Sequence, residues 1–238
     1  MPISRRALLA VAAFCVSAKA LVPAGALADD ASAPLDLQSD KRLKPGNGRP
    51  ANAPPLTDAE IVAKANNFLN TTRFMSADFV QIGPSGRRSE GLLVVQRPGH
   101  MLFRYKPPQK MEIVADGRSV AIRDQKLGTQ DLYLIGQTPL KFLLADHIDL
   151  AKDTSIKRVE MDDRAATIEI VDKATFGGKS DITLVFDPNT FELKQWTVID
   201  PQGFRTLVSL FALDLVTKPD PAWFHIDDSV QPNLTRSR

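Results

Sequence analysis

The feature that most constrains the fold is a series of short apolar runs separated by turn residues. The clearest case is Ile113-Val114-Ala115 and Val120-Ala121-Ile122, which flank Asp116-Gly117, a pair that tolerates the positive φ of a tight primed turn. Further runs of this kind are 167–170, 182–186, 196–199 and 206–216. Because no long helical pattern intervenes, successive runs are expected to pair as an antiparallel sheet. The prediction is a mainly β (α+β) domain.

Two helices are expected beside these strands. Thr57 can cap the first, with Glu60 reaching back to it, and the residues that would share one face are Ile61, Ala65, Phe68, Leu69 and Thr72. A second, short and very apolar helix is expected over 138–145, with Thr138 as its cap and Pro139 at its first position. From sequence, this second helix fits a fixed plug at one end of a β core as well as a movable lid.

Leu92-Leu93-Val94-Val95 is apolar on both faces of a strand. Since side chains alternate along a strand, this pattern predicts a strand that is covered on both sides by core, helix or ligand.

The N-terminal 28 residues are typical of a cleavable export signal. Arg5 and Arg6 precede an apolar run over 7–18, and Ala26-Leu27-Ala28 forms a small-x-small cleavage site. The run is shorter than the ~20 residues that a membrane span needs. The twin arginines also fit the export route for folded proteins, and the ordinary route stays open beside it. The predicted location is the bacterial periplasm.

The rest of the chain divides into three predicted parts. Residues 29–55 are rich in Pro, Asn and Asp and poor in large apolar residues, which favours a flexible linker. Residues 56–230 form the predicted domain, and 231–238 form a C-terminal tail.

Removal of the signal changes the charge and the cysteine content. The whole chain has 30 bases and 28 acids, and residues 1–28 contain three bases and no acid, so 27 bases remain against 28 acids. The mature chain therefore lacks the positive charge that would suggest a nucleic-acid partner. Cys15, the one cysteine of the sequence, lies in the signal, so no disulfide, thiolate ligand or cysteine nucleophile is expected.

No catalytic constellation is visible. His100, His147 and His225 lie far apart and show no zinc-binding spacing, so neither a metal nor a cofactor is expected. Gly178-Lys179-Ser180 lacks the upstream glycine of a phosphate loop, where Lys173 stands instead. The chain is predicted not to be an enzyme, and a lipid hydrolase is the least favoured alternative because no nucleophile and base are paired.

Several motifs occur in an order that resembles the periplasmic outer-membrane lipoprotein carrier family, LolA. An A-x-F-x-Q strand begins at Ala77, and a G-x-L-x-x-x-R-P-G segment runs from Gly91 to Gly99. An aromatic strand ending in Tyr-x-x-Pro and an I-V-x-D-G hairpin at 113–117 follow. The chain departs from the commoner family pattern at Leu102, where many relatives have a polar or charged residue.

The resemblance implies a strongly curved antiparallel sheet, an incomplete β-barrel, with helices covering an apolar cavity that receives acyl chains. The candidate lining residues are Phe79, Leu93, Val95, Met101, Phe103, Ile113, Ile122, Leu140, Phe142, Leu143, Leu144, Leu184, Phe186, Trp196 and Phe211. Arg97 is expected to hydrogen-bond the backbone of a lid helix and to regulate closing and handover.

By the same resemblance, the expected function is that of a carrier chaperone. It would accept acylated lipoproteins from an inner-membrane ABC exporter and deliver them to the outer membrane, with or without a receptor there, as a monomer. The alternative is a carrier or sensor of another lipid, or a stress-signalling regulator of the same fold.

Overall fold

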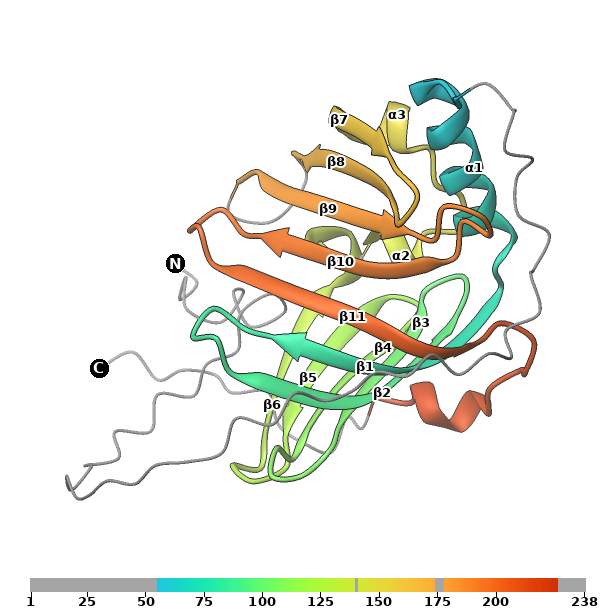
Figure 1. Cartoon of the computed structure of the whole chain (residues 1–238). Coiled ribbons are helices and arrows are strands. Elements are labelled where there is room, and N and C mark those ends of the chain that lie inside the picture. The colour runs from blue at the N-terminus through green and yellow to red at the C-terminus, as the bar shows by residue number, and fades with distance from the viewer. Residues whose placement is uncertain (1–54, 140, 174–177, 227–238) are drawn as a thin grey trace, which may run out of the picture. The chain divides into compact units, whose positions relative to one another are not determined.

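The computed structural model describes residues 55–226 apart from 140 and 174–177. Within these residues, eleven strands form one sheet in the order β6-β5-β4-β3-β2-β1-β11-β10-β9-β8-β7 (Figure 1). The strands are β1 (Phe74–Ile82), β2 (Arg88–Gln96), β3 (His100–Tyr105), β4 (Met111–Asp116), β5 (Ser119–Asp124), β6 (Thr129–Leu134), β7 (Ser155–Met161), β8 (Ala166–Asp172), β9 (Ser180–Phe186), β10 (Leu193–Ile199) and β11 (Arg205–Asp214). Each neighbouring pair is antiparallel. The predicted mainly β fold with a curved antiparallel sheet is confirmed.

Several predicted segments lie outside the described residues. They are the signal (1–28), the linker as far as residue 54, the last part of the predicted domain (227–230) and the tail (231–238). Within the described residues, every helix is too short or too polar to cross a membrane.

The first predicted helix is α1 (Asp58–Thr71), and its start follows from the expected capping box. The Glu60 N–H donates to Thr57 Oγ1 at 3.4 Å, and the Thr57 N–H donates to Glu60 Oε2 at 2.8 Å. These bonds satisfy two backbone donors that have no partner within the helix. Of the expected face, Ile61, Ala65, Phe68 and Leu69 are buried in the core, whereas Thr72 caps the end of the helix and is half-buried.

The second predicted helix is shorter than expected. A 3₁₀ turn, η2 (Ile135–Gln137), comes first, and α2 covers Lys141–Leu144. The Thr138 hydroxyl donates to the Ile135 carbonyl at 2.8 Å, so Thr138 closes η2, and its predicted cap on the following helix stays a prediction because residue 140 lies outside the described residues. A third helix, α3 (Leu150–Asp153), follows, and a 3₁₀ helix, η3 (Pro221–Phe224), lies near the end of the described chain.

The two faces of the sheet bury two separate sets of side chains. On β2, Leu93 and Val95 pack in the large core together with α1, α2 and α3; we call this side the inner face. Val94 packs in a second cluster on the opposite side, the outer face, with Leu92 against it. The prediction that this strand is covered on both sides is confirmed.

The outer-face cluster is small and is covered by η3. Its buried members are Val94, Leu102, Val114, Ala121, Phe224 and Ile226, from β2 to β5 and the η3 region. The rings of Phe224 and His100 lie with centroids 5.5 Å apart, and the Arg104 guanidinium lies 6.0 Å from the Trp223 ring centroid. Leu102 is thus one of the sheet residues buried in the same cluster as Phe224 and Ile226.

The hairpin predicted at Asp116-Gly117 joins β4 and β5. Gly117 has a φ of 98°, and Asp116 accepts the N–H groups of Arg118 and Ser119 at 2.9 and 2.8 Å through Oδ1. The aspartate thus fixes the turn by side-chain hydrogen bonds, while glycine alone takes the positive φ.

Candidate functional site

The inner face brings most of the predicted lining residues together. Thirteen of the fifteen belong to one buried cluster, and none of the thirteen is more than 4% exposed: Phe79, Leu93, Val95, Met101, Phe103, Ile113, Ile122, Phe142, Leu143, Leu144, Leu184, Phe186 and Trp196. They come from β1–β5, α2, β9 and β10, because alternate residues of each strand point to this side. In this structure the face is closed over by the helices.

The other two predicted lining residues differ. Leu140 lies outside the described residues. Phe211 is 52% exposed, so its assignment to the lining is wrong. It pairs with Asp78 on β1, whereas Ser76 pairs with Asp214, so β11 has one extra residue here. This bulge includes Ala212 at a φ of 50°. Phe211 precedes the bulge and lies on the outer face because it alternates with Leu210 and pairs with Asp78, whereas the bulge returns Leu213 to the core side.

An unbroken series of ring contacts crosses the inner face. Phe142 of α2 meets Trp196 of β10 at 6.0 Å between centroids, and Trp196 meets Phe103 of β3 at 6.2 Å. Phe79 lies 5.0 Å from Phe103 and 5.1 Å from Tyr105. All four contacts are edge-to-face, the arrangement that aromatic quadrupoles favour. The α2 helix therefore contacts the middle of the sheet through aromatic rings.

Tyr105 is a member of this face that the sequence prediction missed. Its hydroxyl donates to Gln81 Oε1 at 2.8 Å, and burial raises the pKa of its phenol above the usual range. The period-two alternation from Phe103 could have identified it, because residues two apart on a strand share a face.

The Arg97-Pro98-Gly99 turn between β2 and β3 contacts both covering helices. Arg97 Nη1 donates to the Leu69 carbonyl in the last turn of α1, and the Gly99 N–H donates to the Leu144 carbonyl at the end of α2 at 2.8 Å. The last carbonyls of a helix have no partner within it and carry partial negative charge. The last turn of α1 has no basic residue of its own, so Arg97 supplies that cation from the sheet. Burial lowers the pKa of Arg97 to about 10, which leaves it charged at neutral pH.

Gly99 also allows the β4–β5 turn at Gly117 to approach the β2–β3 turn closely. It has a φ of 78°, and a Cβ at this position would lie 2.6 Å from the Gly117 Cα. The Gly117 N–H donates to the Gly99 carbonyl at 3.1 Å. The contact with α2 is thus supported by the rigid β4–β5 hairpin.

An ion pair holds the other end of α2. Lys141 Nζ lies 2.6 Å from Asp172 Oδ1 on β8, and the Asp172 side chain is 1% exposed. Removing one partner of such a pair leaves a buried charge without its counterion, which is costly. The α2 helix therefore has a polar contact to the sheet at each end and the Phe142 ring in between.

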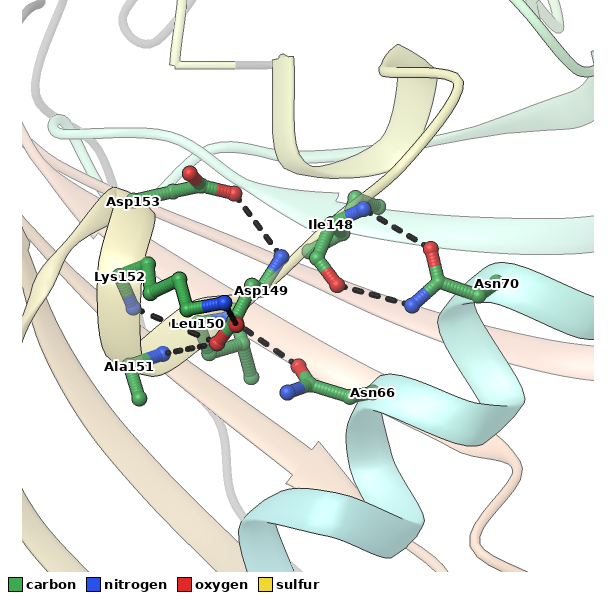
Figure 2. A network of polar contacts seen from close by, with 8 residues as sticks. All are labelled: Asn66, Asn70, Ile148, Asp149, Leu150, Ala151, Lys152 and Asp153. Atoms are coloured by element: carbon green, nitrogen blue, oxygen red, sulfur yellow. Dashed lines mark hydrogen bonds and ion pairs between the residues drawn. The ribbon is translucent and has the colours of Figure 1, made fainter.

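Two asparagines of α1 hold the segment between α2 and α3 (Figure 2). Asn70 Nδ2 donates to the Ile148 carbonyl at 2.8 Å, and Asn70 Oδ1 accepts the Ile148 N–H at 2.8 Å. Asn66 Oδ1 accepts the Leu150 N–H at 3.1 Å. Asp149 then caps α3 by accepting the N–H groups of Ala151 and Lys152. The covering segments are thus connected to one another as well as to the sheet.

This arrangement has the chemistry of a binding site. An apolar face binds through burial and dispersion, which are not directional, so it suits flexible apolar groups. Within residues 55–226 as described, no three His, Cys, Asp or Glu side chains gather so that they could hold a metal ion.

Comparison with known proteins identifies a family for this sequence. The family model "Outer membrane lipoprotein carrier protein LolA" matches residues 70–227. An outer-membrane lipoprotein carrier protein of Methylobacillus flagellatus is 28% identical over 164 residues, which cover 65% of this chain and 78% of that protein.

Two solved structures are similar at low sequence identity. A LolA superfamily protein from Nitrosomonas europaea has a TM-score of 0.41 at 12% identity, covering 72% of this chain and 99% of that one. The MucA/MucB complex of Pseudomonas aeruginosa contains a chain with a TM-score of 0.40 at 14% identity, covering 73% of this chain and 63% of that one. The family resemblance seen in the sequence motifs is confirmed by the family model, which spans more than half of the sequence, and the chain belongs to the LolA family of outer membrane lipoprotein carrier proteins.

Proposed function

We propose that this protein is a periplasmic carrier chaperone that binds the acyl chains of lipoproteins on its inner face and moves them from the inner to the outer membrane. One observation supports this most. Thirteen predicted residues form an apolar face that helices close, and besides apolar packing these helices are held to the sheet by polar contacts such as Arg97 to Leu69 and Lys141 to Asp172. The role is binding and release, without catalysis.

The energetics suit a carrier. Transfer of an acyl chain of about 14 methylenes out of water gains on the order of 11 kcal/mol at about 0.8 kcal/mol for each CH₂. In the absence of cargo, the side chains of α1 and α2 fill the face themselves, so cargo must displace them. The free energy of closing the helices therefore opposes binding and helps release.

Arg97 lies where it can stabilise the closed, cargo-free form over the open form that binds cargo. Its turn holds the end of α1 through the guanidinium and the end of α2 through the Gly99 N–H. Opening either helix breaks a hydrogen bond to this turn. We assign Arg97 to closing and handover, in line with the expectation from the family.

The proposed partners follow from the route. Lipidated proteins would be received from an ABC exporter of the inner membrane and delivered to the outer membrane, directly or through a receptor. The carrier would act as a monomer, since one inner face closes within one chain.

The test is release of a radiolabelled lipoprotein from spheroplasts on addition of the purified protein. A soluble one-to-one complex supports the proposal. The Arg97→Leu variant is expected to accept cargo and to pass less of it to outer membranes. Arg88→Leu is the matched control, because Arg88 begins β2, the strand that Arg97 follows, and forms an exposed pair with Glu90.

Failure of the wild type to release lipoprotein, where another carrier succeeds in the same assay, would contradict the proposal. Native mass spectrometry of protein purified from the periplasm then identifies the alternative. A bound free lipid would indicate a carrier or sensor of another lipid.

A further inference from the structure

Four polar side chains form a row across neighbouring strands at one end of the inner face. They are Asp172 on β8, Ser180 on β9, Asp200 directly after β10 and Thr206 on β11, and we call them the polar row. Asp172 pairs with Ser180 in the sheet register. Ile199, which precedes Asp200, pairs with Asp181, which follows Ser180. Thr206 pairs with Val198, two residues before Asp200.

The polar row continues the apolar lining. Ser180 is followed at period two by Ile182, Leu184 and Phe186, all buried in the inner-face core. Thr206 is followed in the same way by Val208 and Leu210. Since alternate residues share a face, the polar row and the lining form one continuous surface with an apolar body and a polar end.

Three atoms of this row are buried without a hydrogen-bond partner. They are Ser180 Oγ, Asp200 Oδ2 and Thr206 Oγ1. The three residues are 0%, 7% and 5% exposed. Buried polar atoms are nearly always paired in folded proteins, because leaving one unpaired costs its full desolvation. Three such atoms on adjacent strands indicate a site where a polar group of a ligand would find hydrogen-bond partners.

The chemistry of that group follows from the residues. Asp200 already uses Oδ1 to accept the N–H groups of Gln202 and Phe204 at 2.9 Å each, so Oδ2 is the oxygen that needs a donor. The two hydroxyls can each donate or accept. Lys141, a cation near this end, is paired with Asp172. A phosphate would meet two carboxylates here, so the row disfavours phospholipid headgroups and favours a neutral head with an N–H donor.

We propose that the polar row recognises the amide at the head of an acyl chain, as in an N-acylated polypeptide, by accepting its N–H at Asp200 Oδ2 and pairing its carbonyl with the Ser180 or Thr206 hydroxyl. This inference rests on the proposed carrier function and adds a specificity to it. The acyl chain would lie along the apolar lining, and α2 would have to leave its contact with Asp172 for the head to enter.

The test compares two matched probes on the full chain. One is N-palmitoyl-alanine methyl ester, and the other has an ester oxygen in place of the amide N–H. Binding is followed by the fluorescence of Trp196, which lies in the lining, in a Trp223→Phe background. The wild type is expected to bind the amide roughly tenfold more tightly, as a hydrogen bond to a buried carboxylate predicts.

Asp200→Asn is the decisive variant. It keeps an oxygen for the N–H groups of Gln202 and Phe204 and can present an NH₂ group where Oδ2 lies, so it should fold and lose the tenfold preference. Thr206→Val is expected to weaken binding of both probes severalfold. Thr197→Val is the control, because Thr197 is as buried as Thr206 but alternates to the other face of β10, and it should keep the preference.

The outcomes separate this inference from the carrier function. Equal affinity of the wild type for the two probes overturns the role of the polar row and leaves acyl binding standing. A preference that persists in Asp200→Asn also overturns it. If the wild type binds neither probe, the carrier function itself fails.

Discussion

Strands β2 to β5 have apolar residues on both faces, and the two faces are covered in different ways. The outer face is a small apolar cluster under η3, with Leu102 and Phe224 among its members. The inner face is larger and rich in aromatic rings, and its cover consists of α1, α2 and α3. These helices are tied to the sheet and to each other by polar contacts at their ends, such as Arg97 to Leu69.

Under the proposed function, one sheet would contain both a permanent core and a separable interface. Outer-face residues would stabilise the sheet without taking part in cargo binding. Inner-face residues would do both, because they pack against the helices that cargo would displace. Variants that are alike in chemistry but lie on different faces therefore test the comparison directly.

The largest expected effect comes from matched leucine truncations. Leu93 on the inner face and Leu102 on the outer face are 0% and 1% exposed. Each change to alanine should lower the free energy of unfolding by about 2–5 kcal/mol, because it leaves a cavity in a packed core. Urea titration measures this for both variants. Acyl-probe affinity should change for Leu93→Ala and stay at the wild-type value for Leu102→Ala; a change in both would break the distinction between the faces.

Gly91→Ala should destabilise the protein by about 3 kcal/mol through overpacking. A Cβ at Gly91 would lie 2.1 Å from the Arg104 carbonyl oxygen and 2.6 Å from Phe79 Cε1. Strand β3 and the Phe79 ring would have to move together, which should disturb the aromatic series as well. Thermal unfolding with near-ultraviolet circular dichroism tests both effects. Gly83→Ala is the control, because nothing lies within 4 Å of its added Cβ; an equal loss there would point to chain flexibility instead.

Asn70→Asp should cost about 1–2 kcal/mol and loosen the cover of the inner face. The carboxylate can still accept the Ile148 N–H, but it cannot donate to the Ile148 carbonyl. Hydrogen exchange of the 148–153 amides should accelerate, while exchange in β2 to β4 should not. Asn66→Asp keeps the acceptor for the Leu150 N–H and should have a smaller effect. The same acceleration in both variants would argue against a specific role of the Asn70 donor.

The smallest effect is expected in alkaline unfolding. Burial raises the folded-state pKa of Tyr105, so the unfolded chain loses this proton first, and stability should fall as the pH rises from about 10. Tyr105→Phe should make this slope shallower in urea titrations at stepwise pH. Burial also raises the pKa of Tyr133, so part of the slope should remain. An unchanged slope would mean that the Tyr105 phenol is not protected in the folded protein.

Much of the fold could be predicted because its signals are local. The capping box at Thr57 and Glu60 involves residues three apart, and the Asp116-Gly117 hairpin is set by adjacent residues. The prediction for Phe211 was wrong because β11 has apolar residues on both of its faces, such as Leu207 on one and Val208 on the other. The face is set by the register with β1, in which Leu210 pairs with Phe79 and Phe211 pairs with Asp78.

The candidate site was partly predictable for the same reason. Ten of the thirteen buried candidates lie on strands, where alternation places them on one face, and the other three, Phe142, Leu143 and Leu144, lie on α2. The polar row could not be found this way, because Asp172, Ser180, Asp200 and Thr206 become neighbours only through the registers of four strands. Arg97 was expected to bind a helix backbone, but its acceptor, Leu69, is set by how α1 ends against the β2–β3 turn.

The strand order also bears on how the protein reaches its folded state. Among the described strands, β1 and β11 are neighbours in the sheet although nine strands separate them in the chain, and the other neighbours are consecutive. The sheet is therefore two meanders, β1 to β6 and β7 to β11, joined along one seam. Each meander can form from short-range contacts, which are quick to make, whereas the seam needs a long loop to close. Strand β11, the last of the described strands to be synthesised, completes it. Until then the inner apolar surface of the first meander has no partner from the second, so the seam is the step that completes burial of the inner face.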